Sequence, residues 1–447
     1  MRTIGLTAPV LPTLDELRRV REAMHPARVR GMDCHVLDAR YEPGSRCTVL
    51  YRVDDQLLVG TVWFDQEWRD TRVQGNPAGA LWTDSLGIEV HSVPLDPSLP
   101  GLADALRPEI MTRALTDALS ASPMGAKQVV RCQAAIERYR PSRSCTLRLD
   151  VWMRDAVTGA LGRRRLFGKV YPTRAKAESV YATMTEMAGL TDSGSGRLRV
   201  ALPVASVPSL RMVVQEPLPG TSLDLFLRRR AFARTPAHAA ASIRWAAQAL
   251  AELHALDLTH PRQRRVELEL DRLVTRFAAA EAIDAELDAA TRELVDRLRA
   301  GLLDLGLEGQ PGRVVHADCK PSQYLVHADG VGLLDFDHAG MADPALDVGA
   351  FMASLRQLGC RRALERNRPL TGAEGAWVRE QEIAFLRGYI GAADEADGFP
   401  VRVAWYEAFG LLRKARRAMC RSLRSPLPRL LVDEAMECLD PRRRAAS

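Results

Sequence analysis

The pattern of apolar and polar positions changes character near the middle of the chain. In the first half, β-like runs precede two Gly-x-Val-aromatic segments, "LLVGTVWF" ending at Phe64 and "RRLFGKVY" ending at Tyr171, and predict strands. From Leu223 onward, "PAHAAASIRWAAQALAELHALDL" and "RVELELDRLVTRFAAAEAIDAELDAATRELVDRLRAGL" have an apolar face at helical spacing. The pattern therefore predicts a sheet-rich part followed by a mainly helical part.

Further helices and breaks refine this division. "PSLPGLADALRPEIMTRALTDAL" has helical spacing, and "TRAKAESVYATMTEMAG" predicts a helix that ends at Gly189. "RMVVQEPLPGTSL" predicts a buried strand that stops at a Pro-Gly connection, where we place a domain boundary. Within the helical part, "RVVHAD", "QYLVHAD" and "VGLLDFD" predict short strands, with Asp329-Gly330 as a hairpin signal between the last two.

The first part contains an internal repeat. "CHVLDARYEPGSRCT" from Cys34 and "CQAAIERYRPSRSCT" from Cys132 match at Cys, Arg, Tyr, Pro, Cys and Thr with a constant offset of 98 residues. Each copy continues into a Gly-x-Val-aromatic segment, as a duplicated small sheet would. The second copy has a lysine, Lys169, where the first has Thr61.

Composition and charge exclude few classes of protein or binding partner. The 447 residues predict roughly two to three domains, and 47% hydrophobic with 26% charged residues is typical of a folded protein. The net charge of +6 is compatible with a nucleic acid or a phosphorylated small molecule as partner. Nucleic acid is disfavoured, because the arginine-rich stretch "LLRKARRAMCRSLRSPLPRLL" lacks interleaved aromatic residues. We interpret that stretch as a solvated helix face.

Cysteine usage and apolar runs bear on the location of the protein. The eight cysteines include no C-x-x-C pair, so we expect reduced thiols and neither a zinc site nor a redox motif. The N-terminus becomes charged before an apolar core of signal length develops, and no uncharged apolar stretch reaches about 18 residues. We expect a cytoplasmic protein with no membrane partner.

Acids gather in "HADCKPSQYLVHADGVGLLDFD", from His316 to Asp337. Gln323 follows Asp318 by five residues, and Asp335 comes twelve residues later, at the end of an apolar strand. These oxygen donors suit magnesium, which usually accompanies phosphate. A separate aspartate with a lysine two residues on supplies a proton acceptor and a positive charge, which phosphoryl transfer needs.

At this point the chain resembles a known family. "HADCKPSQYLV" is similar to the catalytic loop, and "LLDFDHAGMADPALDVGAF" to the metal-binding segment, of the aminoglycoside and choline phosphotransferase branch of the protein-kinase-like fold. The resemblance implies a two-lobed α+β fold, with Asp318 as catalytic base and Lys320 beside it in the reaction. It implies Gln323 and Asp335 as magnesium ligands. Three further residues would have structural roles near the site: His316, which orders the loop, Asp337 and Asp347.

The resemblance extends over residues 125 to 430. "FGKVY" is similar to the strand whose lysine, Lys169, holds the α and β phosphates, and the resemblance implies Glu178 as its ion-pair partner, with Glu186 as the alternative. "VVQEPLPGTSL" is similar to the adenine-binding hinge, and "YRPSRSCT" takes the place of the glycine-rich loop. The nucleotide contacts expected at the hinge and this turn are Gln215, Glu216, Leu218, Ser142 and Ser144.

Other polar residues receive a plainer interpretation. Asp-rich turns usually cap helices or fill turns, so we expect structural roles for Asp343 and Asp347. His254 and His338 are interpreted as ordinary surface or core residues, because no metal-like spacing of partners surrounds them.

We therefore expect three units: residues 1–121 as an N-terminal cap and degenerate repeat of the N-lobe sheet, residues 122–218 as an N-lobe with the hinge, and residues 219–447 as a mainly helical C-lobe. The expected reaction moves the γ-phosphoryl group of ATP, with GTP left open, to a hydroxyl of a sugar, an amino alcohol or an antibiotic-like natural product, with Mg²⁺ as cofactor. A net basic chain disfavours a polycationic aminoglycoside.

Two alternatives stay open. A kinase acting on serine or threonine of a peptide is favoured by Lys320, and disfavoured by the D-P-x-x-D segment and the lack of an A-P-E motif. The other alternative is a catalytically silent nucleotide-binding module, against which the full set of candidate catalytic residues argues.

Overall fold

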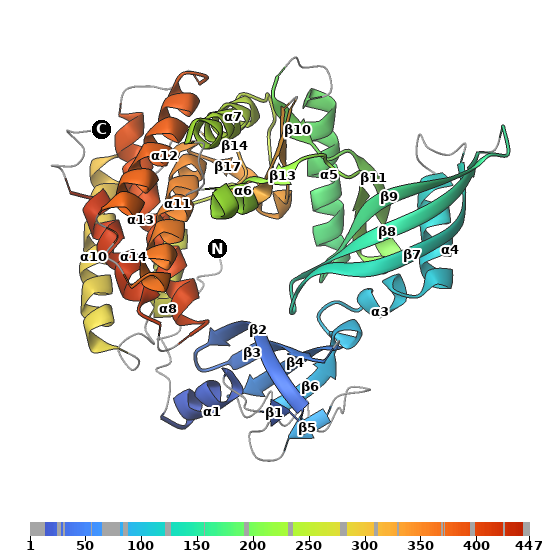
Figure 1. Cartoon of the computed structure of the whole chain (residues 1–447), viewed down its shortest axis with the longest axis horizontal. Coiled ribbons are helices and arrows are strands. Elements are labelled where there is room, and N and C mark those ends of the chain that lie inside the picture. Colours follow the sequence, from blue (N-terminus) through green and yellow to red (C-terminus); the bar gives the residue numbers. More distant parts are fainter. Residues whose placement is uncertain are drawn as a thin grey trace, which may run out of the picture.

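Two antiparallel sheets form the first part of the chain (Figure 1). The computed structural model describes residues 14–24, 28–29, 32–54, 56–64, 81–83, 88–120, 127–155, 157–191, 196–230, 236–277, 284–307, 312–328, 330–367, 370, 372–393, 398–422 and 425–440. The first sheet has the order β1-β2-β3-β4-β6-β5 and is accompanied by α1 (Leu14–Met24). Its strands are β1 (Arg28–Val29), β2 (Met32–Glu42), β3 (Arg46–Val53), β4 (Gln56–Trp63), β5 (Leu81–Thr83) and β6 (Ile88–Ser92).

The second sheet has the order β11-β12-β9-β8-β7. Side chains alternate across it, so Met212 and Val214 pack with one core cluster and Val213 with the other. Helix α4 (Pro108–Ser120) packs on the first of these faces and α5 (Arg174–Thr191) on the second. The strands are β7 (Lys127–Arg140), β8 (Ser144–Asp155), β9 (Leu161–Val170), β11 (Pro203–Val207) and β12 (Met212–Gln215).

The two sheets share the register of their first hairpins. Thr48 of β3 lies opposite Thr61 of β4, and Thr146 of β8 lies opposite Lys169 of β9. Because Thr48 and Thr146 are themselves separated by the repeat offset, the register places Thr61 at the position equivalent to Lys169. Thr61 is buried.

The first hairpin turn is held from outside by an acid of α1. Tyr41 donates its hydroxyl to Glu16 Oε1 at 2.7 Å, and the Gly44 amide donates to the same oxygen at 2.8 Å. Glu16 is buried, so its carboxylate is matched by donors of the turn rather than by water.

The second part is mainly helical, and the predicted α+β class is confirmed. Its core contains the stacked rings of Phe351 and Phe385, with centroids 3.8 Å apart, and the fully buried Trp405. The helices are α6 (Leu223–Arg230), α7 (Pro236–His254), α8 (Val266–Phe277), α10 (Ala285–Asp304), α11 (Ala345–Glu365), α12 (Ala373–Ile390), α13 (Phe399–Met419) and α14 (Leu427–Cys438).

Short strands between these helices carry the acids, as predicted. β15 (Tyr324–His327) and β16 (Gly330–Leu333) form a hairpin, while Asp329 of the predicted turn lies outside the described residues. β10 (Leu198–Val200) pairs with β16 in parallel, which ties the first part to the second. The remaining strands are β13 (Thr221–Ser222), paired with β15, and β14 (Arg313–Val315), paired with β17 (Gly340–Ala342).

The Pro-Gly connection between the two parts needs its glycine. Gly220 has a φ of +123°, a conformation that residues with a Cβ rarely adopt. A Cβ at this position would also lie 2.7 Å from the carbonyl oxygen of Val326. The connection is therefore held close against β15.

Two expected helices differ in their ends. α5 continues past Gly189 to Thr191, since helical backbone tolerates an exposed glycine at a modest cost. The helical run before the second repeat is divided into α3 (Leu102–Ala105) and α4, and Pro108 takes the first position of α4, where its missing N–H costs nothing. Among the described helices, none has the length and apolar character needed to span a membrane.

Candidate active site

His316 orders the loop that follows β14. The Asp318 amide donates to His316 Nδ1 at 3.2 Å, and His316 Nε2 lies 2.8 Å from the carbonyl oxygen of Leu334. The ring is fully buried and bridges the loop to the end of β16. This geometry agrees with the loop-ordering role that the resemblance implies.

Asp347, at the start of α11, holds the same loop through its backbone. The amides of His316 and Ala317 donate to its carboxylate at 2.6 and 2.7 Å, and His254 Nε2 lies 3.1 Å from it. Burial alone would raise the pKa of Asp347, but its hydrogen bond with His254 and the loop amides lower it below its usual range. His254, which also contacts the Tyr389 hydroxyl at 2.7 Å, is thus a core residue that supports the loop.

Asp343 is also structural. Its Oδ1 accepts the amide of Ala345 at 3.0 Å, and its Oδ2 accepts from Arg402 at 2.9 Å. The carboxylate therefore stabilises the beginning of α11, in line with the expected turn role. His338, by contrast, is exposed beside the site.

Asp318 lies at the centre of the candidate site. It forms an ion pair with Lys320, and Gln323 Nε2 lies 3.3 Å from its Oδ2. Burial would raise the pKa of Asp318, but Lys320 outweighs burial and keeps the pKa below its usual range. The carboxylate is therefore ionised and able to accept a proton at neutral pH.

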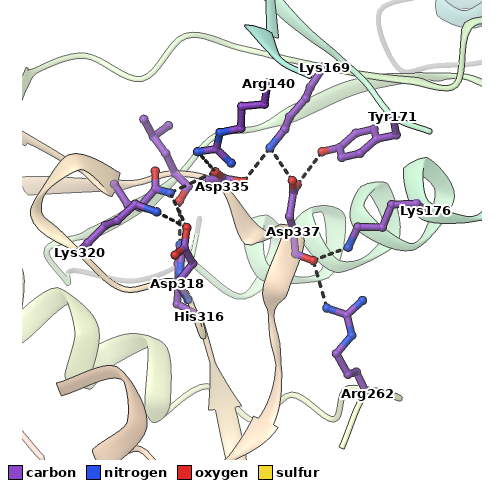
Figure 2. Close-up of polar contacts among 12 residues, drawn as sticks. Arg140, Lys169, Tyr171, Lys176, Arg262, His316, Asp318, Lys320, Asp335 and Asp337 are labelled. Carbon is purple, nitrogen blue, oxygen red and sulfur yellow. Dashed lines mark hydrogen bonds and ion pairs between the residues drawn. The ribbon is translucent and has the colours of Figure 1, made fainter. Parts of the chain in front are cut away.

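Asp335 follows β16 with a φ of +72°, a strained conformation for a non-glycine residue that is common at functional sites. Lys169 Nζ lies 2.7 Å from its Oδ1, Arg140 lies 3.5 Å from its Oδ2, and Gln323 Nε2 lies 3.1 Å from that Oδ2 (Figure 2). Burial opposes ionisation, but Lys169 and Arg140 hold the pKa of Asp335 well below its usual range. The lysine of β9 thus meets an acid 166 residues further along the chain.

Asp337 shares Lys169 with Asp335. Its Oδ2 lies 2.7 Å from Lys169 Nζ, and its Oδ1 accepts from the Tyr171 hydroxyl at 2.8 Å. Its carbonyl oxygen accepts from Lys176 of α5 and from Arg262 at 3.1 Å (Figure 2). Asp337 is therefore a direct ion-pair partner of the β9 lysine.

The expected pairing of Lys169 with Glu178 is not present. Glu178 pairs with Arg174 on the exposed side of α5 at 2.6 Å, and the alternative, Glu186, is exposed as well. On a helix, residues two apart point about 200° apart, so turning Lys176 toward the Asp337 carbonyl turns Glu178 away.

Asp96 holds the turn between β7 and β8 through hydrogen bonds. The sequence analysis did not identify this residue. Asp96 Oδ2 accepts from the Tyr139 hydroxyl at 2.7 Å and from the Ser142 amide at 2.8 Å, in the same way that Glu16 holds the first turn. The Ser142 amide is therefore already engaged, and Ser144 is buried at the start of β8. The phosphate contact expected of the two serines stays a prediction, and for Ser142 it would have to come from the side chain.

The hinge residues follow β12 directly. Gln215 ends that strand, the Glu216 amide donates to Leu202 at 2.9 Å, and the Glu216 side chain pairs with Arg164 at 2.9 Å. Leu218 packs against the core near Gly332. The structure thus places these residues between the lobes, and their contact with adenine remains a prediction.

Gln323 and Asp335 fit a hard cation. Gln323 is 2% exposed, and its amide lies between two carboxylates, where rotation of the amide would present its oxygen instead of its nitrogen. Magnesium is commonly held by one or two protein oxygens, with phosphates and water completing its shell. As the resemblance implies, Gln323 and Asp335 would be the protein ligands. Among the described residues, no group of three or more His, Cys, Asp or Glu side chains is placed to hold a metal.

Several contacts could not be expected from local spacing. Arg140 and Tyr171 lie within "YRPSRSCT" and "FGKVY", but neither was expected at the site, and Asp96 and Lys176 belong to no recognised motif. A separate cavity of about 320 Å³ lies between the start of α8, β17 and Tyr406, and its lining does not include the acids of the candidate site.

Comparison with known proteins identifies a family. The model of a family described as the phosphotransferase enzyme family matches residues 154–399, more than half of the chain. No curated protein matches the chain. Among solved structures, a choline/ethanolamine kinase family protein from Mesorhizobium loti is 16% identical, with a TM-score of 0.45, over 74% of this chain and 96% of that chain. A glucosamine kinase in complex with glucosamine, ADP and inorganic phosphate is 16% identical, with a TM-score of 0.42, over 96% of this chain and 100% of that chain.

Proposed function

Because the chain belongs to the phosphotransferase enzyme family, we propose that it transfers the γ-phosphoryl group of ATP to a hydroxyl group of a small molecule. The observation that carries the proposal is the continuous contact from Asp318 through Gln323 to Asp335, which a lysine of the opposite lobe reaches at 2.7 Å. Proton acceptor, metal ligands and phosphate-binding cation are thus assembled from distant parts of the chain.

In the proposed reaction, the acceptor oxygen bonds to the γ-phosphorus while the bond from that phosphorus to the ADP oxygen breaks. Asp318 accepts the hydroxyl proton, which its lowered pKa allows because the carboxylate is ionised before the reaction. Lys320, which is paired with Asp318, would stabilise charge on the transferring group.

In this proposal, the nucleotide phosphates would lie on the Lys169 side of the site. Lys169 exchanges part of its pairing with Asp335 and Asp337 for contact with the α and β phosphates. Asp335 and the Gln323 amide oxygen would hold magnesium, which when bound would neutralise charge on the β and γ phosphates. The hinge residues Gln215 to Leu218 supply the backbone groups for adenine.

The first sheet takes no part in nucleotide binding. We infer that residues 1–121 form a cap that repeats the N-lobe sheet without its phosphate-binding lysine, because the shared register puts the buried Thr61 at the Lys169 position. Leu50 and Val59 of the cap pack in one apolar cluster with the second sheet, so removal of the cap would expose apolar surface.

One experiment tests the division of roles. ATP consumption is measured over a panel of sugars, amino alcohols, hydroxylated antibiotics and Ser/Thr peptides, with GTP as a second donor. Asp318→Asn should keep MgATP binding by calorimetry and lose turnover, whereas Asp335→Ala should lose both. Equal loss of MgATP binding in the two variants would remove the assignment, and turnover only with peptides would favour the protein kinase alternative.

A further inference from the structure

The cavity of about 320 Å³ beside Tyr406 has a buried interior and an open side. Buried side chains of Leu307, Leu346 and Tyr406 line its inner part, and the exposed Gln263 and Gly312 border its opening. Sites for small molecules in proteins have volumes from about 300 Å³ upward. The cavity is therefore large enough for a small organic molecule and is open to solvent.

This cavity is separate from the candidate active site. Gly312 precedes β14 and lines the cavity, whereas His316 follows that strand and begins the catalytic loop. The intervening strand places the two residues about 13 Å apart. Asp318, the proposed base, is not among the residues that line the cavity. A molecule bound in the cavity is therefore not the acceptor of the proposed reaction.

Tyr406 presents an unpaired hydroxyl group to this cavity. It lies on α13, which is mostly buried and so differs from the solvated face expected of the arginine-rich stretch. Tyr406 is 3% exposed, yet no other described residue forms a hydrogen bond with its hydroxyl. Buried tyrosine hydroxyls usually have a partner, as in Tyr51, which is also 3% exposed and donates to the carbonyl oxygen of Ala23 at 2.8 Å. The Tyr406 hydroxyl is therefore available to a molecule in the cavity.

The charged residues of the described lining are already matched. They form three ion pairs: Arg264 with Glu269 at 2.5 Å, Arg265 with Glu267 at 2.6 Å and Asp343 with Arg402 at 2.9 Å. A charged ligand would have to break one of these pairs, whereas an uncharged one would not. Paired carboxylates can still accept hydrogen bonds from hydroxyl groups, and the leucines suit a carbon face. The lining therefore favours an uncharged ring compound with several hydroxyl groups, such as a sugar or a cyclitol.

One wall of the cavity is tied to the metal-binding loop. The Arg264 amide donates to the Met341 carbonyl oxygen at 2.9 Å, and its guanidinium donates to the His338 carbonyl oxygen at 3.1 Å. Arg262, which does not line the cavity, donates to the Asp337 carbonyl oxygen at 3.1 Å (Figure 2). A ligand that packs against Arg264 and Met341 would therefore stabilise the segment that holds this loop.

We propose that the cavity is a second small-molecule site, which binds an uncharged polyhydroxylated ring compound through the Tyr406 hydroxyl and transmits its occupancy to the metal-binding loop. The inference goes beyond the proposed function, since the bound molecule is not phosphorylated. Because the ligand stabilises the segment that holds the loop, the ligand and the magnesium nucleotide should each strengthen the binding of the other.

The first test compares Tyr406→Phe with Tyr51→Phe in thermal unfolding. Without a probe, Tyr406→Phe should keep or raise the melting temperature, because its hydroxyl has no protein partner, whereas Tyr51→Phe should lower it. Glucose and myo-inositol are the neutral probes, and glucosamine and glucose 6-phosphate are the charged counterparts. A neutral probe should raise the melting temperature with saturation in the parent and in Tyr51→Phe, and Tyr406→Phe should remove most of that increase.

Three results would overturn the proposal. The first is a lower melting temperature of Tyr406→Phe without a probe, which would show that the hydroxyl is bonded within the protein. The second is the absence of a saturable increase with either neutral probe, or an increase of equal size in the two variants. The third is an increase that depends on Tyr406 and is larger with a charged counterpart, which would reject the ligand class.

The second test measures coupling between the two sites by calorimetry. The neutral probe should tighten MgADP binding roughly fivefold or more, and MgADP should tighten probe binding by the same factor. Arg262→Met should keep the affinity of the nucleotide-free protein for the probe and remove the coupling. Probe binding that leaves the MgADP affinity of the parent unchanged would overturn the link to the loop. Failure of MgADP to bind at all would instead reject the proposed function, and the Tyr406 comparison would still decide the cavity site.

Discussion

A single substitution, Asp96→Ala, removes the hydrogen bonds that hold the β7–β8 turn. Asp96 is 3% exposed, and its Oδ2 accepts from the Tyr139 hydroxyl and the Ser142 amide at 2.7 and 2.8 Å. Its other oxygen accepts from the Ser98 amide at 2.8 Å. No glycine-rich loop exists here, so the shape of the turn depends on this carboxylate. Ser142, with a φ of +58°, is held in a left-handed conformation that a free turn would tend to leave.

The magnitude follows from the hydrogen bonds lost. A hydrogen bond to a charged group contributes roughly 1.5–3 kcal/mol, so opening of the turn at Ser142 should become easier by about that amount. Amide exchange at Ser142 should accelerate roughly 10- to 100-fold, as measured by hydrogen–deuterium exchange over residues 139–145. Because the turn must then be ordered when the nucleotide binds, we expect the KM for ATP to rise about tenfold, with a smaller change in the acceptor KM.

The first hairpin supplies the matched control. Glu16→Ala removes the same pair of contacts, to Tyr41 and Gly44, from a turn that lies in the cap. It should accelerate exchange around Gly44 and leave the KM for ATP unchanged. The reasoning is refuted if exchange over residues 139–145 stays at the parental rate in Asp96→Ala, or if the two variants raise the KM for ATP equally.

The remaining predictions concern the lysine of β9 and the carboxylate at the start of α11. Lys169→Met should lower kcat/KM for ATP roughly a hundredfold, because the ammonium is lost and the apolar stem kept, while Thr61→Ala should leave it unchanged; near-parental turnover of Lys169→Met would reject the β9 assignment. Asp347→Ala should lower the melting temperature and the turnover together, since two buried loop amides lose a charged acceptor worth roughly 1.5–3 kcal/mol each; an unaltered melting temperature contradicts this.

The candidate acids could be recognised from the sequence because their arrangement is local. Asp318, Gln323 and Asp335 flank one hairpin of β15 and β16, whose pairing puts Tyr324 opposite Leu333. In such a hairpin, spacing along the chain determines proximity in space. The repeat could be recognised for the same reason. Two antiparallel hairpins with the same turn pair their strands in the same register, so equivalent residues keep a constant spacing along the chain.

The partner of Lys169 could not be recognised in this way. Its contacts with Asp335 and Asp337 join positions more than 160 residues apart. The expected contact with Glu178, by contrast, depends on the rotation of α5 about its axis. Lys176, and not Glu178 two residues later, is the α5 residue whose side chain faces the loop. Helical periodicity predicts that a polar face exists, but it does not predict the atom that this face will meet.

The sequence by itself determined the family, the α+β class, the order of sheet and helices and the acids of the candidate site, because each of these follows from short-range pattern or contiguous motif. Only the tertiary structure decided that Asp96 holds the β7–β8 turn and that Asp337 pairs with Lys169. These contacts join separate elements, and their strength depends on burial and on the charges that remain unpaired once the chain has folded. The sequence gives the number of basic residues and hence the net charge. The electrostatic field at a site depends instead on which of these residues the fold brings near an acid.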